Sequence, residues 1–355
     1  MSLQELGIEH KHIPEMLAAT IHLNLKARAE LRDILRELAE HIPPEHIAGP
    51  AFCTFQFITS FPEGYEVEVG FPVSQPVEAG RIKTRRLPAL EVLALRHRGP
   101  IVGLMESARE LYAYLREHGL ISDEFRREVY LDWQDPAREI ELQAVLHNWT
   151  GLLEANVARV LGMRAREKVM RGCAALTVES TLAERFSWTK GAMDRLEALA
   201  DDDQRYDVVS GCAHVFPRGE LEKLRAVYQE AQERTGDGLA AVDAVIAYTK
   251  QRGWGDARLF REGHVIYATK APAQKERYEL AETAAERRTA YCFCPVLVPY
   301  LNSNGMPETY CYCGSGWYRQ QWEYATGRPV RVKMIRLVHR GDDHCEFAIH
   351  LPEDL

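Results

Sequence analysis

The sequence lacks several features that large classes of proteins require. Its 355 residues carry a formal net charge of -8, so the excess of lysine and arginine on which nucleic-acid binding depends is missing. No apolar run is long enough to span a membrane, and the opening stretch MSLQELGIEHKHIPEM lacks the basic and apolar segments of a secretion signal. Eight cysteines are too few for a disulfide scaffold in a chain of this length. We therefore expect a cytoplasmic protein that binds neither nucleic acid nor a membrane directly.

The composition that remains is typical of a globular protein with two domains. Apolar residues make up 46% and charged residues 27% of the chain, which is long enough to form two hydrophobic cores. The stretch LHNWTGLL, residues 146–153, is the candidate junction, and it is short. We expect one domain over residues 1–147 and a second over residues 151–355.

The first 147 residues contain a pattern that occurs twice. Two segments rich in alternating apolar residues, HIPEMLAATIHLNL and RLPALEVLALRHRG, align so that Pro14 matches Pro88, and such alternation predicts strands. Each segment is followed by an apolar stripe at helical spacing, in residues 28–42 and 101–119, and then by two more strand patterns. This order predicts a duplicated strand–helix–strand–strand domain of the α+β class. Both helices should cover one face of the sheet, and a cleft should lie where the halves meet.

This duplicated unit, with FPV ending its first copy and YLDWQDP leading into its last strand, resembles the GyrI-like effector-binding domain over residues 5–147. The resemblance implies a ligand sensor of the kind found in bacterial multidrug-responsive and AraC-type regulators, whose ligands are often flat, aromatic and cationic. In such regulators a helix-turn-helix segment precedes the sensor. Here the pattern begins within the first ten residues, so we expect no DNA-binding domain. Some stand-alone relatives resemble hydrolases that act on reactive alkylating compounds.

Carried over position by position, the resemblance implies a ligand site at Glu68, Tyr130, Trp133 and Glu141. A carboxylate in an apolar cleft loses solvation, so it pairs with a cation or takes up a proton. An aromatic cation satisfies that charge and also stacks on the aromatic rings. In the hydrolase alternative, Glu68 or Glu141 activates a water molecule and Tyr130 donates a proton to the leaving group.

The second half changes from helical patterns to strand patterns. Residues 151–252 contain amphipathic runs, one of them entered through Pro217 and closed by Gly236. In GCAHVFP, Cys212 and His214 are candidate metal ligands, although a small packing residue is the favoured explanation of Cys212. Strands are expected in LFREGHVIYATK, YCFCPVLVPYL, TYCYCGSGWY and VRVKMIRLVHRGDDHCEFAIHL.

The segment CYCGSGWYRQQWEYATGRPVRVKMIRLVHRGDDHCEFAI resembles the end of a 4-vinyl-reductase-type sensor domain. That family often holds a structural zinc through a cysteine, a glutamate and two further cysteines. Cys311 and Cys345 match the first and last of these ligands, whereas Met334 and Leu337 stand at the other two positions. This departure counts against a metal, but further thiols lie nearby in the sequence, at Cys292, Cys294 and Cys313.

Three hypotheses explain the five clustered thiols. If the two Cys-x-Cys pairs lie on neighbouring strands, alternate residues face the same side and four thiols can converge on zinc. The thiols could instead stay reduced in a core or a ligand pocket, or form a redox-labile pair. An iron–sulfur cluster is less favoured because the chain has no Cys-x-x-Cys run.

Both halves thus resemble small-molecule sensors. We expect a bacterial protein that binds or senses a hydrophobic, aromatic ligand, with or without a positive charge, and whose partner is a second copy or a separate regulator protein. The alternative is a hydrolase of the GyrI-like type. A purely structural scaffold is disfavoured because it needs neither clustered thiols nor paired carboxylates on strands.

Overall fold

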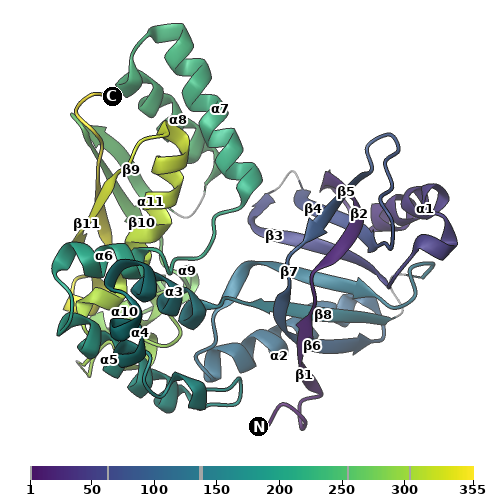
Figure 1. Ribbon diagram of the computed structural model, residues 1–355, viewed down its shortest axis with the longest axis horizontal. Coiled ribbons are helices and arrows are strands. Elements are labelled where there is room, and N and C mark those ends of the chain that lie inside the picture. Colours follow the sequence, from purple (N-terminus) through teal and green to yellow (C-terminus); the bar gives the residue numbers. More distant parts are fainter. Residues whose placement is uncertain (1, 62–63, 136–138, 254–255, 304) are drawn as a thin grey trace. The chain divides into compact units, whose positions relative to one another are not determined.

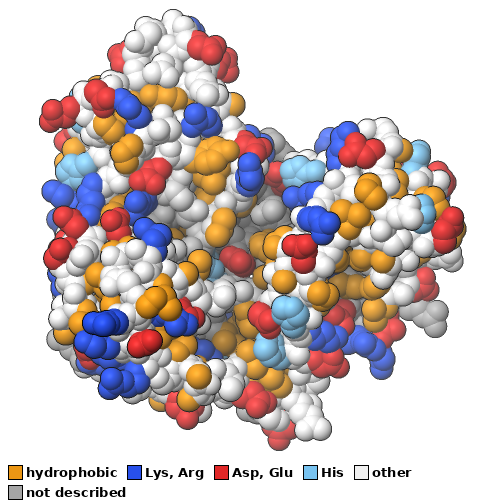
Figure 2. Space-filling view, viewed as in Figure 1, with side chains coloured by type: hydrophobic (Ala, Val, Ile, Leu, Met, Phe, Trp, Pro, Cys, Tyr) orange, Lys and Arg blue, Asp and Glu red, His pale blue; other side chains and the backbone are white. Residues whose placement is uncertain are grey.

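The computed structural model describes residues 2–61, 64–135, 139–253, 256–303 and 305–355 (Figure 1). The chain forms two compact units, residues 1–147 and residues 148–355, which are described separately. In the part of the chain that the structure describes, no helix is long and apolar enough to cross a membrane. On the face shown in Figure 2, acidic and basic side chains are interspersed rather than separated into large patches of one sign.

The first unit is a large antiparallel sheet with two helices. Its sheet has eight strands in the order β1-β6-β8-β7-β3-β4-β2-β5. The elements are β1 (Ile8–Ile13), β2 (Met16–Leu25), α1 (Leu31–His41), β3 (Ala51–Phe61), β4 (Gly64–Pro72), β5 (Lys83–Leu87), β6 (Leu90–Arg98), α2 (Leu104–Glu117), β7 (Ser122–Tyr130) and β8 (Glu139–Leu146).

Each opening segment that the sequence predicted as one strand consists of two strands. The break falls at Pro14 in the first segment and at Pro88 in the second, because proline cannot donate a ladder hydrogen bond. The short strand before each proline pairs in the other half of the sheet, β1 with β6 and β5 with β2, so each short strand is an edge of the sheet. The mixed α/β class is confirmed, whereas an internal duplication as the origin of this order stays a prediction.

One face of this sheet is covered by both helices. Cross-strand pairs place the following side chains in a single buried row on that face: Ile21, Val69, Cys53, Glu128, Leu142, Leu95 and Ile8. Helix α1 packs against β2 and β4, and α2 packs against β6 and β8. The pleat sends alternate residues to the opposite face, which neither helix covers.

The second unit combines helices with a small antiparallel sheet of order β11-β12-β10-β9. Its helices are α3 (Trp149–Leu161), α4 (Met163–Val169), α5 (Leu182–Glu197), α6 (Asp202–Ser210), α7 (Arg218–Thr235), α8 (Gly238–Arg252), α9 (Lys275–Glu279), α10 (Ala284–Tyr291) and α11 (Tyr312–Thr326). Its strands are β9 (Asp256–Glu262), β10 (Val265–Lys270), β11 (Arg331–Arg336) and β12 (Glu346–His350).

The sequence predicted some of these elements and missed others. Helix α7 follows Pro217 and ends at Gly236, whose φ of 68° is left-handed, as expected for a helix C-terminus. The strand predictions for YCFCPVLVPYL and TYCYCGSGWY are wrong. The first segment contains the end of α10, a loop and a 3-10 turn, and the second contains a 3-10 turn and the start of α11.

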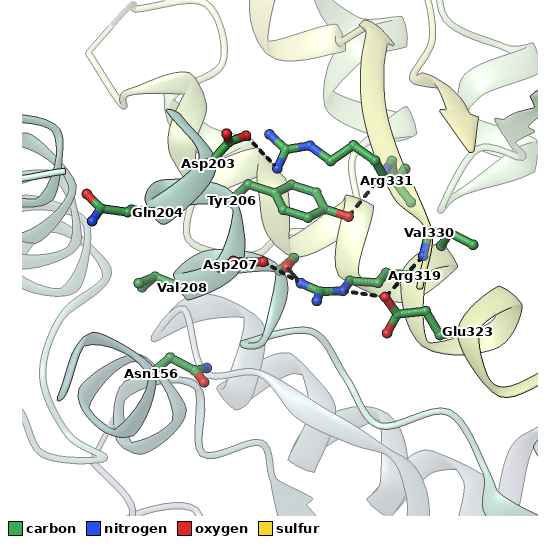
Figure 3. Close-up of polar contacts among 12 residues, drawn as sticks. Asn156, Asp203, Gln204, Tyr206, Asp207, Val208, Arg319, Glu323, Val330 and Arg331 are labelled. Carbon is green, nitrogen blue, oxygen red and sulfur yellow. Dashed lines mark hydrogen bonds and ion pairs between the residues drawn. The ribbon is translucent and has the colours of Figure 1, made fainter. Parts of the chain in front are cut away.

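Helix α11 is joined to α6 and β11 by close packing and by polar contacts (Figure 3). A Cβ on Gly316 would lie 1.9 Å from the carbonyl oxygen of Ser210, so only glycine allows this approach of α11 to α6. The guanidinium of Arg331 lies 3.8 Å from the ring centre of Tyr206 and pairs with Asp203 at 2.9 Å. Arg319 adds ion pairs to Asp207 on α6 and to its own helix. Charged contacts thus join α6 to α11 and β11, which follow it at a long distance in the sequence.

A buried ionic cluster lies on the covered face of the first unit. Glu128 is fully buried and accepts two hydrogen bonds of 2.6 Å from Arg28, with Arg126 at 3.6 Å. Burial would lower the pKa of Arg28, but hydrogen bonds and the charge of Glu128 outweigh it and raise this pKa. Tyr130 donates a further hydrogen bond of 3.0 Å to the same carboxylate.

The substitution Glu128→Gln is expected to lower the free energy of unfolding by about 3 kcal/mol, because it leaves largely buried guanidinium groups without a counter-charge. Urea denaturation of the full chain measures the effect. The matched control Glu117→Gln, at an exposed position on α2, should change stability by no more than about 0.5 kcal/mol. Equal stability of the two variants would contradict this account of the cluster.

Candidate functional site

Glu68 and Glu141 lie on the same, uncovered face of the first unit's sheet. Glu68 on β4 pairs across the ladder with Thr54, and Thr54 pairs with Arg127 on β7. Arg127 in turn pairs with Gln143, which is two residues from Glu141 on β8. Because residues two apart on a strand share a face, the register brings both predicted carboxylates to one side. Their exposed fractions are 8% for Glu68 and 7% for Glu141, so neither points into bulk water.

Each carboxylate is paired with a basic side chain from an edge strand. Arg85 on β5 reaches past β2 and donates two hydrogen bonds to Glu68, one of them 2.5 Å long from its Nε. Lys11 on β1 reaches past β6 and donates to Glu141 at 2.7 Å. The Arg85 side chain remains 56% exposed and that of Lys11 28% exposed. The carboxylates are therefore held beneath long side chains that have one end in solvent.

Arg127 lies between the two ion pairs. It is 5% exposed, and its guanidinium carbon is 4.2 Å from the ring centre of Phe52. Burial lowers the pKa of Arg127 to about 10, against the opposing influence of the charges on Glu68 and Glu141. The face therefore carries alternating charges in the order Lys11, Glu141, Arg127, Glu68 and Arg85, which we call the charge row.

The other two predicted site residues lie elsewhere. Tyr130 follows Val129, which is the cross-strand neighbour of Glu141, so the pleat turns Tyr130 to the helix-covered face. There it is 1% exposed and donates its hydrogen bond to Glu128. Trp133 follows β7 and makes an edge-to-face contact with the buried Phe71, with ring centres 5.9 Å apart. The structure thus does not bring Tyr130 or Trp133 together with the carboxylates.

Sequence reasoning missed the basic half of this site. Gln143 lies between Leu142 and Ala144 on β8, and this alternation was the available signal for its face. Arg127 gave no such signal, because it lies between Arg126 and Glu128 on β7. Lys11 and Arg85 gave no such signal, because β1 and β5 were not recognised as separate strands.

The five clustered thiols come together, but not on neighbouring strands. Cys292 and Cys294 lie in the loop after α10, Cys311 ends a 3-10 turn, and Cys313 lies in the first turn of α11. Burial raises the pKa of Cys311 well above its usual value, and the charges of the other four thiols of the cluster raise it further, so each of the four lies near enough to Cys311 to act on it. Every described cysteine is a free thiol.

The arrangement of these thiols favours neutral, protonated sulfur. Cys294 and the hydroxyl of Tyr310 form a hydrogen bond of 3.0 Å, and Cys313 donates to the carbonyl oxygen of Cys212 at 3.6 Å. Burial raises the pKa of Cys313 to about 12. Within the described ranges, no group of three or more histidine, cysteine, aspartate or glutamate side chains has a geometry that could hold a metal ion. Cys212 itself is fully buried and donates to the carbonyl oxygen of Val208, as a packing residue does.

A lysine and an acid lie beside the thiol cluster. The ammonium nitrogen of Lys270, at the end of β10, is 5.5 Å from the ring centre of Phe293 and 5.9 Å from that of Tyr318. Tyr318 donates a hydrogen bond of 2.6 Å to Asp256. Burial of this carboxyl raises the pKa of Asp256 from 3.8 to about 6, although the Tyr318 hydrogen bond and the Lys270 charge act in the opposite direction.

Comparison with known proteins supports the sensor resemblance of the first unit. Residues 6–144 match the family described as GyrI-like small molecule binding domain. The match covers most of the first unit and none of the second, so the resemblance of the C-terminal region to a 4-vinyl-reductase-type domain stays a prediction. No curated protein matches the chain.

Solved structures similar to part of the chain include two of EcmrR. The EcmrR–DNA complex shares 21% identity over 39% of this chain and 56% of its own, with a TM-score of 0.35. The EcmrR C-terminal domain shares 22% identity over 39% of this chain and 96% of its own, with a TM-score of 0.34. A hydrolase from Listeria innocua shares 13% identity over 39% of this chain and 90% of its own, with a TM-score of 0.29.

The raised pKa of Asp256 makes stability depend on pH. Between its usual pKa of 3.8 and about 6, the folded protein binds this proton more than the unfolded chain does, so stability falls as pH rises through that window. Across this window the free energy of unfolding falls by about 3 kcal/mol at most. Asp256→Asn keeps an acceptor for Tyr318 and is expected to be more stable than the natural protein at pH 7.5 but not at pH 4. Urea denaturation at both pH values measures the stability of Asp256→Asn relative to the natural protein, with Asp343→Asn at an exposed position as the control. A stability difference that does not depend on pH would contradict the raised pKa of Asp256.

Partial burial and raised pKa values predict low reactivity of the thiols. The thiolate is the reactive form, so iodoacetamide at pH 8 should label Cys292, Cys294, Cys311 and Cys313 at least tenfold more slowly in the folded protein than in urea. Mass spectrometry of tryptic peptides follows each site. A bound zinc ion would give the same protection, so elemental analysis of protein purified without added metal separates the two causes. Rapid labelling of the folded protein would contradict burial of these thiols.

Proposed function

We propose that the first unit binds a small organic molecule on the uncovered sheet face, at the charge row, and that the protein senses or sequesters this molecule. The observation that supports the proposal is the burial of Glu68, Arg127 and Glu141 on a face that neither helix of the unit covers. Buried charges are costly unless they are paired, and Arg127 forms no ion pair with a described residue, so its retention on this face favours a binding role. The match of residues 6–144 to a small-molecule binding family agrees with it.

A hydrolase is the weaker alternative. That hypothesis required Glu68 or Glu141 to act as a general base with Tyr130 as proton donor. Tyr130 is on the opposite face of the sheet and its hydroxyl is engaged by Glu128. Both oxygens of Glu68 accept hydrogen bonds from Arg85, which leaves that carboxylate poorly placed to activate water. Binding without turnover therefore fits the site better.

The charge of the ligand is a separate question. The sequence favoured an aromatic cation, and a cation reaching Glu68 or Glu141 would have to displace Arg85 or Lys11. Displacement of Arg85 is the easier of the two, because its side chain is half exposed and partly solvated ion pairs contribute little. A positive charge on the ligand stays a prediction.

Substitutions of the two carboxylates test the site. A panel of aromatic dyes of both charges is titrated by fluorescence against the full chain, Glu68→Gln and Glu141→Gln. For a dye that binds the natural protein, each variant is expected to change the dissociation constant at least about tenfold, or 1.4 kcal/mol. Removal of a negative charge should weaken binding of a cationic dye and strengthen binding of an anionic one.

The matched control is Glu40→Gln, which makes the same change at an exposed position on α1 and should leave dye binding unaltered. Urea denaturation of each variant identifies any loss of folding. Unchanged affinity in both carboxylate variants would exclude the charge row as the binding site. Chromatography of the recovered dye distinguishes retention from hydrolysis.

A further inference from the structure

Arg127 has hydrogen-bonding capacity that the described residues do not use. Its Nη2 donates only to the sulfur of Met16, at 3.8 Å, and its buried Nε has no partner among the described residues. Glu68 and Glu141 act on it through their charges, but neither forms an ion pair with it. A buried guanidinium N–H without an acceptor costs free energy, so its retention calls for an acceptor from outside the chain.

Gln143 offers an acceptor directly beside this donor. The two residues are cross-strand partners, and such side chains have Cβ atoms about 5 Å apart. Gln143 is 3% exposed and its Nε2 donates to Glu141 at 2.8 Å, while its Oε1 is buried without a partner in the described part of the chain. Exchanging the amide oxygen and nitrogen would set oxygen against a carboxylate oxygen, so the hydrogen bond fixes the orientation.

Arg127 is the member of the charge row whose positive charge forms no ion pair with a described residue. Lys11 pairs with Glu141 at 2.7 Å and with Glu9 at 2.9 Å, and Arg85 pairs with Glu68. An anionic group that reached Arg127 would supply this ion pair and accept the unused N–H, whereas a cationic group would have to displace Arg85 or Lys11 from a carboxylate. Lys11 and Arg85 extend across this face from the edge strands, so a change in their side-chain conformations would give the anionic group access to Arg127.

We propose that the small molecule bound on this face carries an acidic group that pairs with Arg127, next to a hydroxyl or N–H that donates to Gln143. This inference rests on the proposed function and names the chemical class of its ligand, an aromatic organic acid with a neighbouring hydrogen-bond donor.

Three probes that share a ring and differ in charge test the acidic group: 2-naphthoate, 2-naphthamide and 2-naphthylmethylammonium. Isothermal titration of the full chain should show naphthoate binding at least tenfold more tightly than either of the others. Arg127→Lys keeps the charge but removes the Nε–H donor, and it should weaken naphthoate at least tenfold while changing naphthamide less than twofold. In addition, 3-amino-2-naphthoate, which keeps one N–H free after donating the other to its own carboxylate, should bind more tightly than naphthoate, and Gln143→Leu should abolish this advantage.

The probe series on the natural protein decides the matter even if a variant fails to fold. Equal affinities, or tighter binding of the ammonium probe, would overturn the acidic ligand while leaving small-molecule binding intact. Naphthoate binding that is unchanged in a folded Arg127→Lys variant would overturn the role of Arg127. If no naphthalene probe and no dye of the panel binds, the proposed function fails together with this inference.

Discussion

The period-two alternation of the pleated sheet is the constraint on which the first unit depends. It gives an eight-stranded sheet two faces, and the described helices of this unit, α1 and α2, pack on one of them. The covered face holds a nearly continuous apolar row with one buried carboxylate, Glu128, and that carboxylate needs the guanidinium of Arg28. The uncovered face combines small apolar clusters with the charge row. A shift of one residue in any strand would exchange the two sets of side chains.

The edge strands have a specific part in this arrangement. Because Pro14 and Pro88 end β1 and β5 before the longer strands begin, each short strand crosses to the other half of the sheet. Lys11 and Arg85 stand three residues before these prolines, and each extends over the neighbouring strand to a carboxylate. The two ion pairs thus occupy corresponding places in the two halves, with Arg127 between them. Charges so arranged stabilise one another, and removal of one leaves its partner buried without a counter-charge, which is unfavourable.

The second unit shows how the same residues suit two local structures. Cys-x-Cys with intervening aromatic residues alternates as a strand does, and this alternation predicted strands that the structure does not form. In the structure, buried residues on α11 recur at helical spacing, at Ser315, Tyr318, Trp322 and Ala325. The packing of α11 against α6 at Gly316 stabilises a helix here rather than a strand. The thiols therefore come from a loop, a 3-10 turn and a helix. Such convergence from irregular segments explains why the thiols are close without a metal-binding geometry among the described residues.

The sequence by itself determined the mixed α/β class, the order and approximate limits of most strands and helices of the first unit, and the presence of Glu68 and Glu141 on strands. These features follow from local periodicity, from proline and glycine positions, and from a resemblance carried by short motifs. Only the tertiary structure decided which strands became edges, which face each side chain took, and which charges met. Tyr130 shows the reason: it is one residue beyond the neighbour of Glu141, and cross-strand register, set by contacts distant in the sequence, turns it to the other side of the sheet.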